Sequence, residues 1–339
     1  MSFHSYLSEE PFALECGEKL ECLELAYHTY GTINSARDNI VWICHALTAN
    51  SDPVEWWPGL AGSGKLFDPS EYFIICVNML GSCYGSSGPL SINADTGRPY
   101  YRTFPQVTVR DMARSMIELR QNLQIEKIHI AIGGSMGGQQ VLEWAVMEPG
   151  IIEHIIPIAT NVRHSPWGKA FNEAQRMAIE ADATWKEDSP EAGKSGLKAA
   201  RAIGMLSYRT YEAFLKTQAD EIDGSGQFKA VSYQQYQGEK LAKRFTAQSY
   251  WLLSHAMDNH NLGRERGKIT DVLKTITSHT LVISVTSDNL FPVSEQEFIA
   301  SHISGAIHRT IDSEFGHDGF LIEFNQLREI IKEYLHHAG

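Results

Sequence analysis

Hydrophobic positions in the first half of the chain alternate between short β-type runs and helical patterns. Runs of apolar and β-branched residues predict strands over Leu23–Thr29, Ile40–Cys44, Tyr72–Asn78, Ile128–Ile132 and Ile155–Ala159. The spacing of apolar residues predicts helices over Thr108–Leu123, which begins with a capping-box-like Thr108 and Asp111, and over Gly137–Met147. Strands that alternate with helices in this way predict an α/β fold whose mostly parallel sheet is covered on both faces.

The second half of the chain follows a different pattern. From Phe171 to about His260 the residues are typical of helices, and strand signals are nearly absent. Strand character returns at Thr280–Val285 and Ala306–Ile311, and Phe320–His336 has the pattern of a closing helix. A sheet that is interrupted by helices and then resumes predicts a core with an inserted helical cap. We expect residues 1–163 and 273–339 to form the core and residues 164–272 to form the cap.

Composition and charge narrow the class of protein. The 339 residues carry 29 basic and 41 acidic side chains, a formal net charge of −12 that would repel nucleic acid and acidic membranes. No apolar run approaches the roughly 18–20 residues of a membrane helix. The five cysteines are odd in number and lack C-x-x-C spacing, which suits free thiols in a reducing compartment. We therefore expect a soluble cytoplasmic protein that binds neither nucleic acid nor membranes.

The strongest chemical signal is Gly133-Gly134-Ser135-Met136-Gly137, directly after a predicted strand and before a predicted helix. This is the G-x-S-x-G nucleophile elbow of α/β-hydrolases. The serine of such an elbow occupies a strained turn, so its neighbours must be small enough for the backbone to bend sharply. A glycine-rich turn with a surface serine is the alternative, but the flanking strand and helix favour Ser135 as a nucleophile.

A serine nucleophile needs a base that is itself held in place by a third group. In α/β-hydrolases the chain order is Ser, then Asp or Glu, then His. Asp288 follows the predicted strand ending at Val285, and His317 follows the next strand, so both fall at carboxyl ends of parallel strands, where such sheets bind ligands. We expect His317 to take the serine proton and Asp288 to orient its imidazole.

The same arrangement predicts an oxyanion hole formed by two backbone N–H groups. One comes from the residue after the nucleophile, Met136, and the other from the loop after an early strand. That loop begins His45-Ala46-Leu47-Thr48, which makes Leu47 the second expected donor. No H-E-x-x-H or paired-cysteine motif is present, so we expect no metal site.

Several longer stretches make the chain resemble the homoserine O-acetyltransferase family of the α/β-hydrolase superfamily. They are His45-Ala46-Leu47-Thr48, Gly81-Ser82-Cys83-Tyr84-Gly85-Ser86-Ser87-Gly88-Pro89, Phe104-Pro105 with Thr108–Met112, Gly133–Gly138 with Leu142–Ala145, and Gly316-His317-Asp318. The resemblance runs nearly from end to end and is weakest in the expected cap, between about residues 183 and 235. It implies an α/β-hydrolase core and a helical cap that helps to form a homodimer.

The resemblance also implies a reaction and a substrate site. In such a ping-pong reaction Ser135 takes acetyl from the co-substrate acetyl-CoA, no cofactor stays bound, and L-homoserine attacks the acyl-enzyme. Arg201 resembles the family residue that holds the amino acid's carboxylate, and Tyr208, about two helical turns later, should point the same way. Asp318 would accept the substrate ammonium.

Departures from the family pattern leave the substrates open. They are Ala49-Asn50-Ser51-Asp52 after the His-Ala-Leu-Thr motif, and Gln139-Gln140 after the elbow. A homoserine O-succinyltransferase, a serine O-acyltransferase and a serine esterase remain alternatives on the same scaffold. A protein that only binds a ligand is a further alternative, although here no member of the expected triad is missing.

Overall fold

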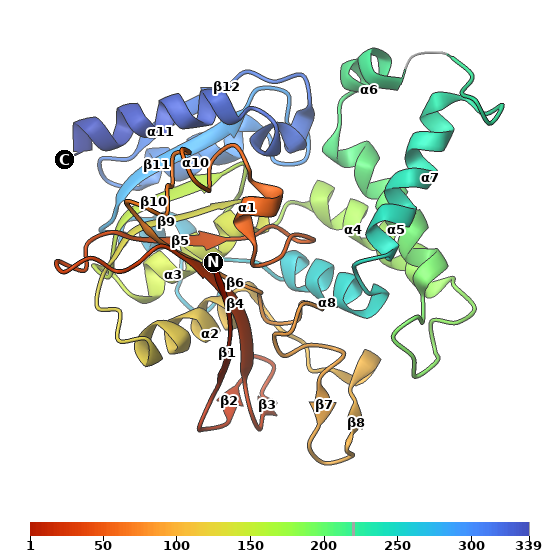
Figure 1. Cartoon of the computed structure of the whole chain (residues 1–339), viewed down its shortest axis with the longest axis horizontal. Coiled ribbons are helices and arrows are strands. Elements are labelled where there is room, and N and C mark those ends of the chain that lie inside the picture. Colours follow the sequence, from red (N-terminus) through yellow and green to blue (C-terminus); the bar gives the residue numbers. More distant parts are fainter. Residues whose placement is uncertain (219–220, 339) are drawn as a thin grey trace.

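The computed structural model describes residues 1–218 and 221–338, and its centre is an eight-stranded sheet in the order β1-β4-β6-β5-β9-β10-β11-β12 (Figure 1). These strands span Ser2–Leu7 (β1), Glu24–Tyr30 (β4), Ile40–Cys44 (β5), Phe73–Val77 (β6), Ile128–Gly134 (β9), Ile152–Ile158 (β10), His279–Val285 (β11) and Ile307–Ile311 (β12). The pairs β1–β4 and β4–β6 are antiparallel, and the pairs from β6 to β12 are parallel. The predicted mostly parallel α/β sheet is therefore confirmed.

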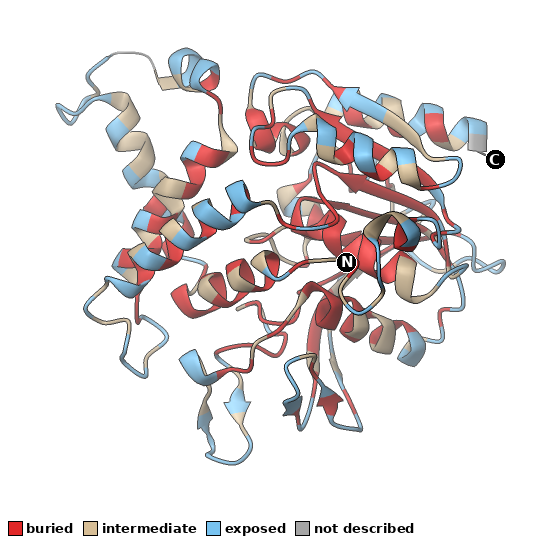
Figure 2. Cartoon of the chain, turned by 180° about the vertical axis from the view of Figure 1, so that it is seen from behind, coloured by how far each residue is buried: buried red, intermediate tan, exposed pale blue. Residues whose placement is uncertain are grey.

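Helices cover both faces of this sheet because its central strands are apolar on both sides. One face packs against α2 (Val109–Asn122), α3 (Met136–Met147) and α10 (Val293–His302). The other face packs against α11 (Phe324–Ala338) and the segment around α1 (Pro53–Trp56). Figure 2 shows the buried sheet between more exposed helices. The expected capping box is present, since the Thr108 side chain accepts from the Asp111 N–H and the Asp111 side chain accepts from the Thr108 N–H.

Six helices separate β10 from β11, and the first five of them lie to one side of the sheet (Figure 1). They are α4 (Pro166–Glu180), α5 (Lys194–Tyr208), α6 (Tyr211–Gln218), α7 (Lys229–Ala242), α8 (Ala247–Asp258) and α9 (Ile269–Leu273). Within residues 1–218 and 221–338, no helix is both long and apolar enough to cross a membrane.

The structure corrects the predicted start of the last helix and adds elements that periodicity did not predict. Helix α11 begins at Phe324, not Phe320, because Gly316–Leu321 forms a 3₁₀ turn (η2) whose last residues lead into it. Two short hairpins, β2–β3 (Phe12–Ala13 with Lys19–Leu20) and β7–β8 (Ile92–Asn93 with Arg98–Pro99), and a 3₁₀ turn, η1 (Tyr101–Thr103), lie outside the main sheet. Their strands are two residues long, too short for an alternating pattern.

Candidate active site

Ser135 occupies a sharp turn between β9 and α3. Its φ of +57° is a conformation that residues other than glycine rarely adopt. Two hydrogen bonds to neighbouring segments hold the turn: the Ser135 N–H donates to the Ile158 carbonyl over 2.9 Å, and the Thr160 hydroxyl donates to the Ser135 carbonyl over 2.7 Å. The backbone strain is therefore offset by contacts with the end of β10.

The glycines beside Ser135 allow the elbow to approach the neighbouring strand β5. A Cβ atom on Gly137 would lie 2.1 Å from the Cys44 carbonyl oxygen, and one on Gly133 would lie 2.8 Å from the same oxygen. Real Cβ atoms do not approach backbone oxygens so closely. Side chains at these two positions would push the elbow away from β5 and from the loop that follows it.

Asp288 and His317 form a buried hydrogen-bonded pair. Nδ1 of His317 and Oδ2 of Asp288 are 2.6 Å apart, and the two residues are 5% and 3% exposed. The other oxygen of Asp288 accepts hydrogen bonds of 2.8 Å from the N–H groups of Leu290 and Phe291. The Phe291 ring stacks on the imidazole, with ring centres 4.9 Å apart. The carboxylate is thus fixed from both sides and holds the imidazole by Nδ1, so Nε2 is the nitrogen that can face a nucleophile.

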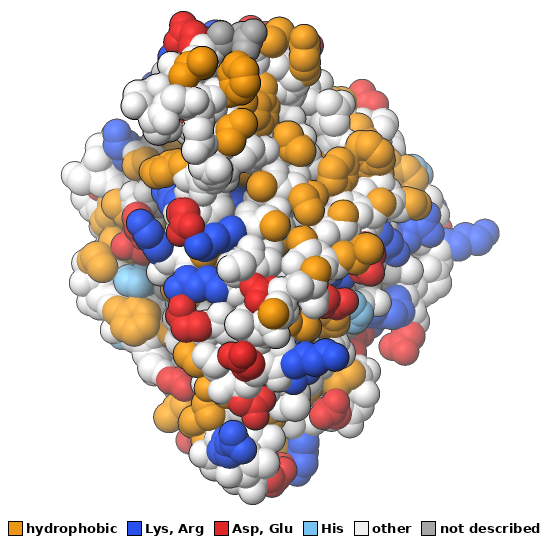
Figure 3. All heavy atoms as spheres, turned by 90° about the vertical axis from the view of Figure 1, so that its right-hand side faces the viewer, with side chains coloured by type: hydrophobic (Ala, Val, Ile, Leu, Met, Phe, Trp, Pro, Cys, Tyr) orange, Lys and Arg blue, Asp and Glu red, His pale blue; other side chains and the backbone are white. Residues whose placement is uncertain are grey.

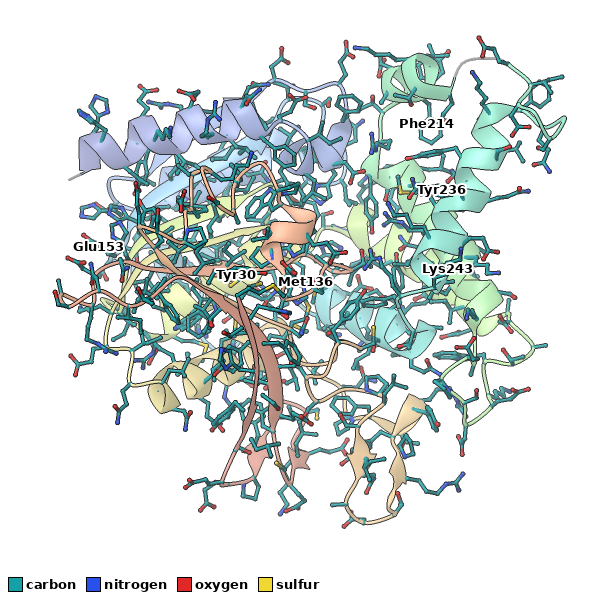
Figure 4. All side chains as sticks on the ribbon, in the orientation of Figure 1. Tyr30, Met136, Glu153, Phe214, Tyr236 and Lys243 are labelled. Carbon is teal, nitrogen blue, oxygen red and sulfur yellow. The ribbon has the colours of Figure 1, made fainter. Side chains whose placement is uncertain are left out.

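One cavity of about 600 Å³, including its open mouth, brings most of the predicted site residues together. Its lining includes Ser135 and His317 from the core, with Leu47, Arg201, Tyr208 and Asp318 around them. Met136 is fully buried as the first residue of α3, so it offers its backbone rather than its side chain. Figure 4 labels Met136 near the centre of the molecule, at the side of the core that faces the cap helices.

Two polar residues for which the sequence predicted no supporting role, His45 and Gln140, hold the loop around Leu47. His45 is buried, its Nε2 accepts from the Met79 N–H over 3.0 Å, and its Nδ1 is 2.9 Å from the Ala46 carbonyl. Burial lowers the pKa of His45 to about 4, so the ring is neutral and donates from Nδ1. The Gln140 amide donates to the carbonyls of His45 (3.3 Å) and Met136 (3.2 Å) and so links the loop to the elbow helix.

Two arginines with different surroundings stand at the cap side of the cavity. The Arg201 guanidinium lies 5.5 Å from the centre of the Tyr208 ring, as the spacing of the two residues on α5 predicts, and it forms no ion pair with any residue in the described part of the chain. Asp318, by contrast, accepts a hydrogen bond of 2.7 Å from Nε of Arg209. The sequence did not reveal Arg209, because it lies 109 residues away from its partner.

Comparisons with known proteins agree with this geometry. A family model described as the α/β hydrolase fold matches residues 39–324. The homoserine O-acetyltransferase of Cyclobacterium marinum is 49% identical over the whole of this chain and 97% of its own length. The chain belongs to the homoserine O-acetyltransferase family. The resemblance stated from sequence motifs is thereby confirmed.

Solved structures extend the comparison to the whole fold. The homoserine O-acetyltransferase of Bacillus anthracis superposes with a TM-score of 0.90 at 24% identity, covering 98% of this chain and 97% of its own. An acetylester hydrolase from Corynebacterium glutamicum superposes with a TM-score of 0.87, also at 24% identity, covering 98% of this chain and 95% of its own. At such identities the likeness shows the fold alone. Acetyltransferases and ester hydrolases therefore share the architecture that this family uses.

Proposed function

We propose that the protein is a homoserine O-acetyltransferase that moves an acetyl group from acetyl-CoA to the hydroxyl of L-homoserine. Membership of the family supports this activity. The single observation that carries the acceptor is the pair of opposite charges, Arg201 and Asp318, in the lining of the cavity that holds Ser135. A zwitterionic amino acid needs a cation for its carboxylate and an anion for its ammonium.

In the first half-reaction Ser135 is the nucleophile. His317 Nε2 removes the proton of the Ser135 hydroxyl as its oxygen attacks the thioester carbonyl, and Asp288 stabilises the imidazolium that forms. The backbone N–H groups of Leu47 and Met136 donate hydrogen bonds that stabilise the negative charge on the carbonyl oxygen. The C–S bond then breaks, the CoA sulfur takes the proton from His317, and acetyl-Ser135 remains.

In the second half-reaction the same groups act in the reverse order. His317 removes the proton of the homoserine hydroxyl, whose oxygen attacks the acetyl carbonyl of acetyl-Ser135. The two N–H groups again stabilise the oxyanion. When the bond to Ser135 breaks, its oxygen recovers the proton from His317 and O-acetylhomoserine leaves. The proton that leaves with CoA comes from Ser135, and the homoserine hydroxyl proton replaces it on Ser135. The enzyme therefore ends the cycle with the protons it began with.

Arg201 and Asp318 bind the amino acid in this proposal, and Tyr208 supports Arg201. The guanidinium has no carboxylate partner among the described residues, so its planar donors are available for a bidentate contact with the substrate carboxylate. Arg209 holds Oδ2 of Asp318 and leaves the second oxygen for the substrate ammonium. We assign Arg209 as a positioning residue, because it acts through Asp318.

The main alternative is an esterase that transfers the acyl group to water. The likeness of the fold to an acetylester hydrolase favours keeping this alternative. Succinyl-CoA as donor and serine as acceptor are further alternatives, since a few side chains of the cavity decide between these substrates.

Mass spectrometry of the intact protein, followed by a substrate matrix, tests the proposal. Incubation with acetyl-CoA alone should add one acetyl group to Ser135 and release CoA in a burst. Ser135→Ala should lose both, and turnover should fall by about 10⁴–10⁶. The matrix combines acetyl-, propionyl- and succinyl-CoA with homoserine, serine and water. Hydrolysis faster than transfer at millimolar homoserine would favour the esterase, and absence of acetyl-Ser135 would rule out the ping-pong route.

We also propose that the cap, residues 164–272, forms a homodimer in the cytoplasm. Large apolar side chains are exposed on its outer helices, including Leu206, Tyr211, Leu215, Phe228 and Tyr236, each more than half exposed. Figure 3 shows hydrophobic side chains gathered on the upper part of the face that carries the cap. Exposed patches of this kind mark contact surfaces. Sedimentation velocity should give twice the mass of one 38.0 kDa chain.

A further inference from the structure

Three neighbouring strands of the sheet each place a histidine near their amino end. His129 is the second residue of β9, His154 the third of β10, and His279 the first of β11. The parallel register pairs His154 directly with His279 and with Ile130, next to His129. Glu153 precedes His154 on β10. These four residues therefore meet at the end of the sheet formed by the amino ends of these strands, although up to 150 positions separate them in the sequence.

The cluster lies at the end of the sheet opposite to the candidate active site. Ser135 follows the carboxyl end of β9, whereas His129 stands near the amino end of the same strand. Six residues of extended chain separate them by about 20 Å. Figure 4 labels Glu153 at the margin of the core and Met136 near the middle of the molecule. The acyl-transfer chemistry proposed for Ser135 makes no use of this cluster.

We propose that His129, Glu153 and His154 bind a divalent transition-metal ion of the zinc type. One ligand atom from each of the three residues lies within 4.8 Å of the other two. Nδ1 of His129 is 2.9 Å from Oε2 of Glu153, and Nε2 of His154 is 3.8 Å from Oε1 of the same carboxylate. Ligand atoms on one tetrahedral zinc ion are about 3.4 Å apart, so small rotations of the side chains close the site.

The type of ligand selects the type of ion. Two imidazoles and one carboxylate suit zinc and its neighbours in the transition series, whereas calcium and magnesium prefer oxygen ligands alone. Three protein ligands leave a fourth position open. His279, whose ring centre lies 5.3 Å from that of His154, lines the same surface depression as His129 and Glu153.

The surroundings of His154 prepare it to act as a ligand. Its side chain is only 4% exposed, and its Nδ1 lies 3.1 Å from the Tyr334 hydroxyl on α11. Because Nδ1 is paired with the Tyr334 hydroxyl, Nε2 is the ring nitrogen that faces Glu153. Metal-binding histidines commonly donate their second nitrogen to such an outer partner.

Two cations beside the cluster do not occupy it. Lys127 and Arg37 line the same surface depression as His129 and Glu153. The Lys127 ammonium donates to the Gly150 carbonyl, and Arg37 donates to the Gln124 carbonyl over 2.9 Å. Both cations thus donate to backbone oxygens, and the Glu153 carboxylate contacts His129 and His154. A bound ion would join β9, β10 and, through Tyr334, α11, and so stabilise this edge of the fold.

Calorimetric titration of the chelator-treated full chain with zinc chloride tests the site. We expect one ion per chain at the cluster and a rise in the melting temperature when zinc is added. Loss of a residue that hydrogen-bonds to a metal ligand costs about 10–100-fold in metal affinity, and loss of a ligand itself should cost no less. Glu153→Gln and His129→Gln should therefore each weaken zinc binding at least tenfold. Both side chains are at the surface, so these variants should keep the fold. Tyr334→Phe should weaken binding by about tenfold.

Two controls separate this site from other histidines. His317→Asn removes the imidazole of the candidate active site, and the double variant His336→Ala with His337→Ala removes the exposed pair near the end of α11. Both should keep full zinc affinity. The proposal is overturned if the unmodified chain takes up no zinc in a saturable way, or if its uptake survives both Glu153→Gln and His129→Gln.

Discussion

Replacement of Arg201 by methionine separates the two half-reactions of the proposed mechanism. The guanidinium lies over the Tyr208 ring and has no carboxylate partner among residues 1–218 and 221–338, and in the proposed mechanism the bound amino acid supplies that partner. A hydrogen bond to a charged group contributes about 1.5–3 kcal/mol. Arg201→Met should therefore lower kcat/KM for homoserine by roughly ten- to 150-fold. The CoA burst from acetyl-CoA alone should not change, because the thioester step precedes amino-acid binding.

A truncated acceptor shows whether the loss comes from the carboxylate. The compound 3-aminopropan-1-ol keeps the ammonium and the hydroxyl of homoserine but lacks its carboxylate. The unmodified protein should use it poorly, and Arg201→Met should use it equally poorly. Lys198→Met is the matched control, because Lys198 lies on the same helix and pairs with Glu239 on the surface. A variant that slows the CoA burst, or that lowers transfer to both acceptors by the same factor, would refute the role of Arg201.

Three further predictions follow from contacts around the elbow and the triad. Arg209→Met should raise the KM for homoserine several-fold without changing acetyl-Ser135 formation, because Asp318 loses the partner that positions it; an equal loss of acetylation speed would contradict this. Gly137→Ala should lower the free energy of unfolding in urea by about 3 kcal/mol through the clash with the Cys44 carbonyl, whereas Gly224→Ala, whose Cβ meets no atom within 4 Å, should not. Burial raises the pKa of Glu295 to about 7. The folded chain therefore keeps a proton there that the unfolded chain releases near pH 4.5, so the contribution of this group to the free energy of unfolding falls as pH rises from about 4.5 to 7. Glu295→Gln should remove that decline and gain about 1–2 kcal/mol over the unmodified protein at pH 8 but not at pH 4, as measured by urea unfolding at the two values.

Features that depend on neighbouring residues in the chain could be predicted from the sequence. The β5 strand Ile40–Cys44 is a buried apolar run in a region bounded by polar residues, so its ends coincide with the prediction. The capping box at Thr108 needs only four consecutive residues. The elbow combines a strand, a glycine-rich turn and a helix within about twenty residues. Each of these features could be predicted because the residues that cause it are neighbours in the sequence.

Contacts across the sheet or between core and cap carry no such local signal. Arg209 and Asp318 meet only because the end of α5 packs beside the turn Gly316–Leu321. His129 and His154 meet because β9 pairs with β10 in one particular register, and a shift of one residue would turn one of them to the other face of the sheet. No motif spans these distances. The sequence therefore predicted Ser135 from a local motif but gave no signal for Arg209 or for the histidine cluster.

The candidate triad and the expected substrate-binding residues are held by different parts of the fold. The candidate triad and the two expected oxyanion donors belong to the core, where each is fixed by backbone geometry or by a buried carboxylate. Arg201 and Tyr208, by contrast, stand on cap helix α5, whose outer face is exposed and whose inner face lines the cavity. Arg201 packs on Tyr208 of its own helix, so in the proposed mechanism a substitution of Arg201 alters the acceptor without changing the turn at Ser135. In the proposed mechanism an acetyltransferase and an acetylester hydrolase keep the same core fold, and a charge from the cap, Arg201, together with Asp318 from the core selects an amino acid over water as acceptor.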